Sequence, residues 1–119
     1  MNEIEMKQRT KEFSLRVIRL VGELEKQSKA VTRAIAGQLI RAGTSVGANY
    51  RAACRARSKA EFAAKLGIAE EEADECCYWL EIVIEAGLVK PPQVEPLLQE
   101  ANEIVAIITA SRKTVQKRM

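Results

Sequence analysis

The chain has 119 residues, 47% of them hydrophobic and only five of them aromatic, and its formal net charge is +3. This length and composition predict one domain, residues 1–119, built from helices rather than sheets. The absence of histidine excludes histidine-dependent nucleophilic triads and the Glu-x-x-His metal sites of four-helix bundles.

Apolar residues recur at three-and-four spacing in four segments, the pattern of amphipathic helices. The expected helices cover roughly residues 4–27, 30–55, 58–87 and 91–117. Ser58 and Glu61 form a capping box that opens the third helix. Gly87 suits the end of this helix, and Pro91-Pro92 suit the first turn of the next. Short connections predict that consecutive helices run antiparallel, which gives an all-α, up-down-up-down four-helix bundle.

The short turns also predict which residues lie level with one another. In the second and third helices, residues whose numbers sum to about 113 should be neighbours, and in the third and fourth helices the sum is about 180. Arg41 then lies level with Glu72, and we expect a structural ion pair between them that specifies the register more than it stabilises the fold. Gly43-x-x-x-Gly47 indicates a close helix–helix contact.

Two segments carry only apolar or aromatic side chains at five successive positions, Cys76 to Leu80 and Ile104 to Ile108. Five positions cover the whole circumference of a helix, and one bundle face cannot bury so wide a surface. We therefore expect a homo-oligomer, although a generous core with scattered apolar surface residues is the other interpretation. The expected interface residues are Tyr78, Trp79, Ile82, Val83 and Ile107.

A cluster of cations lies at the expected turn between the second and third helices. Arg51, Arg55, Arg57 and Lys59 belong to it, and residues 1–60 as a whole carry 13 Lys and Arg against five Glu. Clustered cations bind RNA or DNA backbones by charge without reading sequence. The other interpretation is a solvated face with structural salt bridges. No aromatic residues interleave with the arginines, so base stacking is not expected.

Carboxylates suggest a different kind of site. Glu71-Glu72-x-x-Glu75, followed by Glu100-x-x-Glu103, is similar to the boxes with which all-helical nucleotide pyrophosphohydrolases hold magnesium. However, the second box ends in Glu rather than Asp, and the expected register places it more than a helical turn from Glu72. A solvated acidic face explains the pattern more simply. We therefore expect no catalytic residue, metal, cofactor or small-molecule substrate.

The cysteines and the first residues predict the environment of the protein. Cys54, Cys76 and Cys77 are odd in number, and with no His and no Cys-x-x-Cys we expect them to be free thiols that pack as small hydrophobes. The start of the chain, MNEIEMKQR, is charged rather than apolar, unlike a secretory leader. No uncharged run approaches the roughly 20 residues of a membrane span. These features predict a cytoplasmic protein without a membrane partner.

Residues 38–89 resemble the bacterial family of 23S ribosomal RNA intervening-sequence proteins. The matching pieces are Gln38-Leu39-x-Arg41-Ala42, Thr44-Ser45-Val46-x-Ala48-Asn49, Arg57-Ser58-x-x-Glu61-Phe62, Leu66, Ala69, Glu72, Glu75, Trp79-Leu80 and Gly87-Leu88. The resemblance implies a left-handed four-helix bundle that assembles into a five-subunit ring, with no catalytic residues to carry over. A related branch of diversity-generating retroelement accessory proteins implies a basic pentamer that binds nucleic acid and assists a reverse transcriptase.

The leading hypothesis is a non-enzymatic, ring-forming cytoplasmic scaffold whose biochemical role is unassigned and which contacts RNA or DNA. One alternative is a magnesium-dependent nucleotide hydrolase that uses Glu71, Glu72 and Glu75. Another is a protein–protein interaction module.

Overall fold

The computed structural model describes residues 1–119 and contains four α-helices, one short 3-10 helix and no strand. The elements are α1 (Glu3–Glu25), α2 (Ala30–Cys54), α3 (Lys59–Glu85), η1 (Pro91–Gln93) and α4 (Glu95–Lys117). The predicted all-α class and the four helices are confirmed. The main difference is at Pro91-Pro92, which form η1 and not the first turn of α4. The proline in the first turn of α4 is Pro96, which needs no helical hydrogen bond there.

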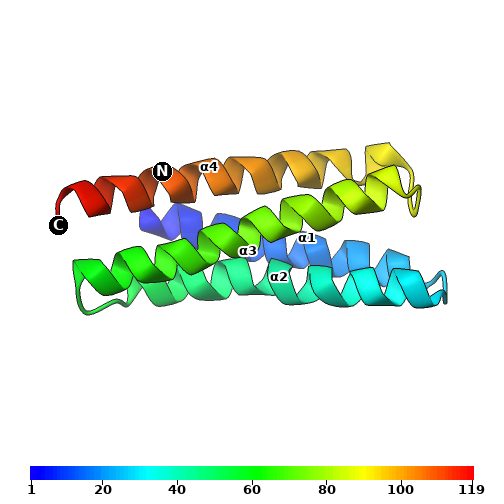
Figure 1. The fold of residues 1–119 in the computed structure, drawn as a ribbon, viewed down its shortest axis with the longest axis horizontal. Helices are drawn as coiled ribbons and strands as arrows, with labels where there is room; N and C mark the ends of the chain where they lie inside the picture. Colours follow the sequence, from blue (N-terminus) through cyan, green and yellow to red (C-terminus); the bar gives the residue numbers. More distant parts are fainter.

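The four helices form a rod of 47 × 20 × 20 Å. In Figure 1 each helix runs back beside the one before it, and both termini lie toward the same end of the rod. The pairs α1–α2, α2–α3 and α3–α4 pack extensively, α1 and α4 touch more lightly, and α1 and α3 lie diagonally across the bundle. None of the helices is both long and apolar enough to cross a lipid bilayer.

The ends of α3 follow the sequence signals. Ser58 caps the first turn by accepting a hydrogen bond from the Glu61 N–H at 3.0 Å. At the other end Gly87 has a φ of 66°, a conformation that is easy only for glycine. The N–H of Leu88 then donates to the Val83 carbonyl at 3.1 Å, the hydrogen bond of a Schellman motif. Local sequence therefore fixes both ends of this helix.

Aliphatic residues and alanines from all four helices fill the core, with Phe13 the largest fully buried side chain. Cys76 and Cys77 lie in this core, and all three cysteines are free. Burial raises the pKa of the Cys76 thiol to about 12 and that of Cys77 to about 11. These two thiols are therefore protonated at neutral pH and act as small hydrophobic side chains.

Two glycines bring α2 into close contact with α1. A Cβ atom at Gly43 would lie only 2.7 Å from Val17 Cγ1, and one at Gly47 would lie 3.2 Å from the Thr10 carbonyl oxygen. The Ser14 hydroxyl crosses the same seam and donates to the Gly43 carbonyl at 2.9 Å. The close contact expected from Gly43-x-x-x-Gly47 is thus present, and it sets the distance between α1 and α2.

Replacing Gly43 by alanine should destabilise the protein, because fully buried Val17 would have to move. Overpacking of this kind costs about 1–3 kcal/mol, of which the better helix propensity of alanine recovers about 1 kcal/mol or less. The matched control is Gly37→Ala, where an added Cβ meets nothing within 4 Å. We expect this control to gain roughly 0.5–1 kcal/mol. Urea unfolding of the two variants measures the difference, and equal stabilities would contradict the assigned contact.

Candidate nucleic-acid interface

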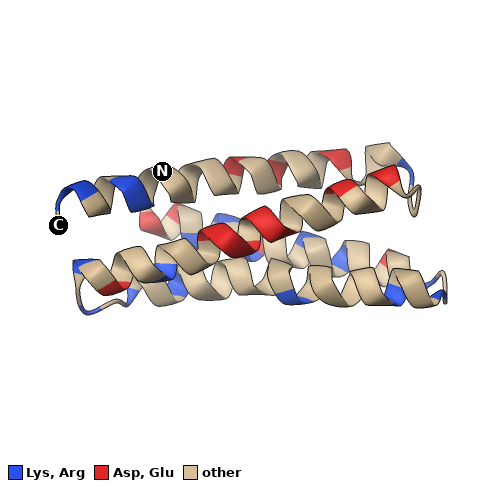
Figure 2. Cartoon of the chain, viewed as in Figure 1, with Lys and Arg blue, Asp and Glu red and all other residues tan.

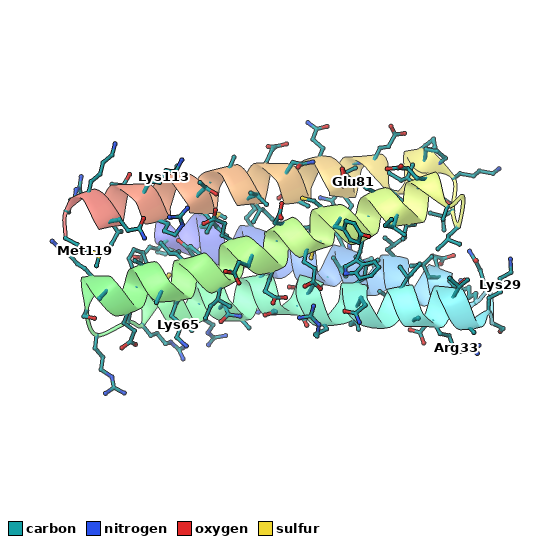
Figure 3. All side chains as sticks on the ribbon, viewed as in Figure 1. Lys29, Arg33, Lys65, Glu81, Lys113 and Met119 are labelled. Carbon is teal, nitrogen blue, oxygen red and sulfur yellow. The ribbon has the colours of Figure 1, made fainter.

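A dense group of cations lies at the end of the rod that holds the two termini. We call this group the basic end, and all four helices and the turn after α2 contribute to it. Figure 3 shows Lys65 and Lys113 toward this end, near Met119, whereas Lys29 and Arg33 lie at the opposite end. The members of the basic end are Lys7, Lys11, Arg51, Arg55, Arg57, Lys59, Lys65, Lys113, Lys117 and Arg118.

Four of these cations line a groove between α1 and α2. Lys7 and Lys11 come from α1, Arg51 comes from α2, and Arg55 directly follows the last residue of α2. No carboxylate is among the lining residues. The groove has a volume of about 490 Å³, large enough to admit phosphate groups of a polyanion. None of the four cations forms an ion pair within the protein. The lining of the groove therefore carries four positive charges and no negative charge.

The structure brings together only part of the cluster expected from the sequence. Arg51 and Arg55 lie in the groove, whereas Arg57 is exposed in the turn and Lys59 is the exposed first residue of α3. The sequence interpretation missed Lys7 and Lys11, although their four-residue spacing places them on one side of a helix. The close α1–α2 contact then places this pair opposite the two arginines.

The α4 cations of the basic end also were not expected, since they follow an acidic stretch of chain. Arg112 connects α4 to α3 just before them: its Nε donates to Glu70 Oε1 at 2.5 Å. The Thr109 hydroxyl donates to the other oxygen of Glu70 at 2.8 Å. The hydrogen bonds from Arg112 and Thr109 hold the pKa of Glu70 below its usual range, against the opposite effect of burial. This clamp holds α4 against α3 at Thr109 and Arg112, directly before the cations of its last turns.

The expected ion pair between Arg41 and Glu72 is present. Arg41 Nη1 donates to Glu72 Oε2 at 3.0 Å, consistent with the expected register of α2 and α3. Arg41 also donates to Glu75, a second partner that the sequence interpretation did not name. Glu75 in turn accepts a hydrogen bond from Trp79 Nε1 at 3.2 Å. The network is partly exposed, so it acts mainly on register.

The two carboxylate boxes bind arginines from different helices. Glu72 and Glu75 contact Arg41 of α2, whereas Glu100 and Glu103 contact Arg9 of α1 at 2.6 and 3.0 Å. No group of three or more His, Cys, Asp or Glu residues has a geometry that could hold a metal ion. The carboxylates of each motif thus contact a guanidinium, which competes with any metal cation for the same carboxylate oxygens.

The expected interface residues divide into two groups. Tyr78 is 55% exposed, and its ring and that of Trp79 pack in a T-shaped arrangement at a centroid distance of 5.1 Å. Trp79, Ile82 and Ile107 are partly buried.

Val83 was assigned to the interface wrongly, because it is fully buried. It continues the inward stripe of Cys76 and Leu80 at four-and-three spacing, which directs its side chain into the protomer core.

The chain is similar to known proteins in sequence and in fold. A sequence model described as 23S rRNA-intervening sequence protein matches residues 2–110. A 1.70 Å crystal structure of a protein with unknown function from the S23 ribosomal protein family of Bacteroides thetaiotaomicron VPI-5482 is similar, with a TM-score of 0.84 and 36% sequence identity. The likeness covers 91% of this chain and 98% of the other. No curated protein matches.

The Glu70 clamp generates a pH prediction. Because the pKa of Glu70 is lowered in the folded protein, its contacts stabilise the fold at neutral pH, and this contribution is lost as the pH falls through the lowered pKa. Between about pH 5 and pH 3, the range of carboxyl titration, the stability of the wild type should fall more steeply than that of Glu70→Gln. The control Glu71→Gln removes an exposed carboxylate without an ion pair and should keep the wild-type slope. Urea unfolding across this pH range measures the free energy of unfolding of the three proteins. Parallel slopes of this free energy against pH would show that the Glu70 contacts do not contribute to the loss of stability in acid.

Proposed function

We propose that this chain, which belongs to the 23S rRNA-intervening sequence protein family, is a non-enzymatic oligomeric scaffold that contacts the backbone of RNA or DNA through its basic end. The observation that carries this proposal is the α1–α2 groove, in which Lys7, Lys11, Arg51 and Arg55 face no carboxylate. Such a groove attracts a phosphate backbone by neutralising its charge and releasing its counterions.

The chemistry of the groove favours backbone contact over base recognition. Its lining contains no aromatic side chain, so it offers no platform on which bases could stack. Arg55 caps the C-terminal end of α2, four residues after Arg51, and this spacing suits successive contacts along one strand. The expected binding is therefore tolerant of sequence and sensitive to salt.

The scaffold role includes self-association in the cytoplasm. Tyr78 is largely exposed although it lies in an uncharged five-residue segment, which supports a contact with another copy. We propose that the oligomer is a homopentameric ring, in which cyclic closure buries the same pair of surfaces on every subunit. Several weak backbone contacts on one ring would then add through avidity.

Replacing Arg51 and Arg55 by glutamine should weaken nucleic-acid binding. Each phosphate contact contributes about 0.7–0.9 to the slope of log affinity against log salt, so this slope should fall by between about one and two. Fluorescence anisotropy with labelled single-stranded RNA and duplex DNA from low to moderate salt measures it. The matched control, Lys29→Gln with Arg33→Gln, removes the same charge from the far end of α2 (Figure 3) and should change the slope less.

Two results would contradict the proposed interface. One is no binding of the wild type to either nucleic acid at low salt. The other is an equal loss in the Arg51/Arg55 variant and in the Lys29/Arg33 control, which would assign the binding to net charge and not to the groove.

The non-enzymatic part of the proposal has its own test. Because Arg41 engages both Glu72 and Glu75, we expect no hydrolysis of nucleoside triphosphates with magnesium or manganese above the rate in buffer. A phosphate-release assay measures this rate. Turnover that disappears in Glu72→Gln and in Glu75→Gln would establish the hydrolase alternative instead.

A further inference from the structure

The outer side of α3 is an acidic face with an aromatic residue at its centre. Its members, Glu71, Asp74, Tyr78, Glu81 and Glu85, follow each other at alternating three- and four-residue spacing, so they form one stripe along the helix. All five are exposed, and none of the four carboxylates forms an ion pair. No Lys or Arg occurs between residues 65 and 90 to neutralise them.

The outer side of α1 has the opposite character. Leu15 and Ile18 are 42% and 44% exposed at its centre. Lys11 lies beside them toward α2, where it lines the basic groove, and Arg19 lies toward α4. Glu12, 3.5 Å from Arg19, is the only carboxylate between residues 6 and 22. We call Lys11, Leu15, Ile18 and Arg19 the basic face.

These two faces cannot meet within one protomer. Figures 1 and 2 show α3 at the front of the bundle and α1 behind it, with α2 and α4 between them. The two helices lie diagonally across the core and share almost no contact. Each protomer therefore carries two complementary faces, pointing in opposite directions, that its own fold leaves uncovered.

We propose that the acidic face of α3 docks on the basic face of α1 of a second copy of this chain. Tyr78 then packs against Leu15 and Ile18, and the flanking charges of opposite sign pair around this apolar centre. The contact uses different surfaces on the two partners, so it is heterologous and repeats from copy to copy. It forms a ring where the rotation between successive copies closes, and an open filament where it does not. This inference rests on the oligomeric part of the proposed function and names the surfaces that build the oligomer.

Charge complementarity identifies the occupant as a second copy. Contact between two α3 faces would bring unpaired carboxylates together. Contact between two α1 faces would bring Lys11 and Arg19 of both copies together with only Glu12, already paired with Arg19, to balance them. Both arrangements oppose association. The α1–α3 pairing avoids both repulsions and covers the exposed apolar residues of each face. Lys11 belongs both to the groove and to the basic face, whereas Lys7, Arg51 and Arg55 line the groove outside both faces. Nucleic acid and a second copy therefore share only Lys11.

Complementary charge reversal tests the pairing. One variant carries Lys11→Glu and Arg19→Glu, and the other carries Asp74→Lys and Glu81→Lys. All four positions are exposed, and circular dichroism checks that both variants fold. Light scattering coupled to size exclusion should show each variant alone as a 13.2 kDa monomer and the wild type as a multiple of this mass. An equimolar mixture should again form species larger than the monomer, because each basic face finds an acidic partner.

The control carries Lys29→Glu and Arg33→Glu, an equal change of charge at the far end of α2, and should keep the wild-type mass. A monomeric wild type would overturn the oligomer of the proposed function and this inference with it. An oligomeric wild type would overturn this inference alone if only one reversal, or neither, causes dissociation. The same holds if both variants dissociate but their mixture stays monomeric.

Discussion

The close contact of α1 with α2 at Gly43 and Gly47 determines the shape of the basic end. Without side chains at these two positions, Val17 and the Thr10 backbone approach the axis of α2 closely. The surface above this seam is then a groove with a floor of small residues rather than a ridge. Lys7 and Lys11 stand on one wall and the two arginines on the other. Helix packing thus produces a concentration of like charge that neither helix has alone, and exposure to water keeps its cost tolerable.

Arginines also explain why the uneven charge of the chain is compatible with a stable bundle. Arg9 and Arg41 belong to the basic first half of the chain, residues 1–60, and bind carboxylates of the acidic second half. Arg112 belongs to the second half and joins α4 to Glu70 of α3. These pairs are partly exposed and act mainly by fixing the heights of neighbouring helices. Charges that are not used inside the protomer remain at its surface. There the cations gather at the basic end and on α1, and the anions on α3.

The sequence predicts the parts of this arrangement that depend on local spacing. The apolar periodicity predicts the four helices. The capping serine and Gly87 predict the ends of α3, and the short turn between α2 and α3 predicts that Arg41 lies beside Glu72. The groove depends instead on how α1 lies against α2, which spacing within either helix cannot specify. Val83 shows a related limit. Because this segment is apolar on all sides, apolar character does not tell which of its residues are buried. Only the position of Val83 on the same inward stripe as Cys76 and Leu80 identifies it as a core residue.

The location of the unpaired charges connects the two proposed activities. In a ring built by lateral contact of α1 with α3, cyclic symmetry places every subunit in the same orientation. Side-by-side rods then present all their basic ends on the same side of the ring. A single groove offers four cations and a modest affinity, whereas one side of a ring offers several grooves to one strand at high effective concentration. Self-association through the middle of the rod would therefore strengthen binding at its end, because the α1–α3 contact takes up Lys11 and leaves Lys7, Arg51 and Arg55 open to the strand.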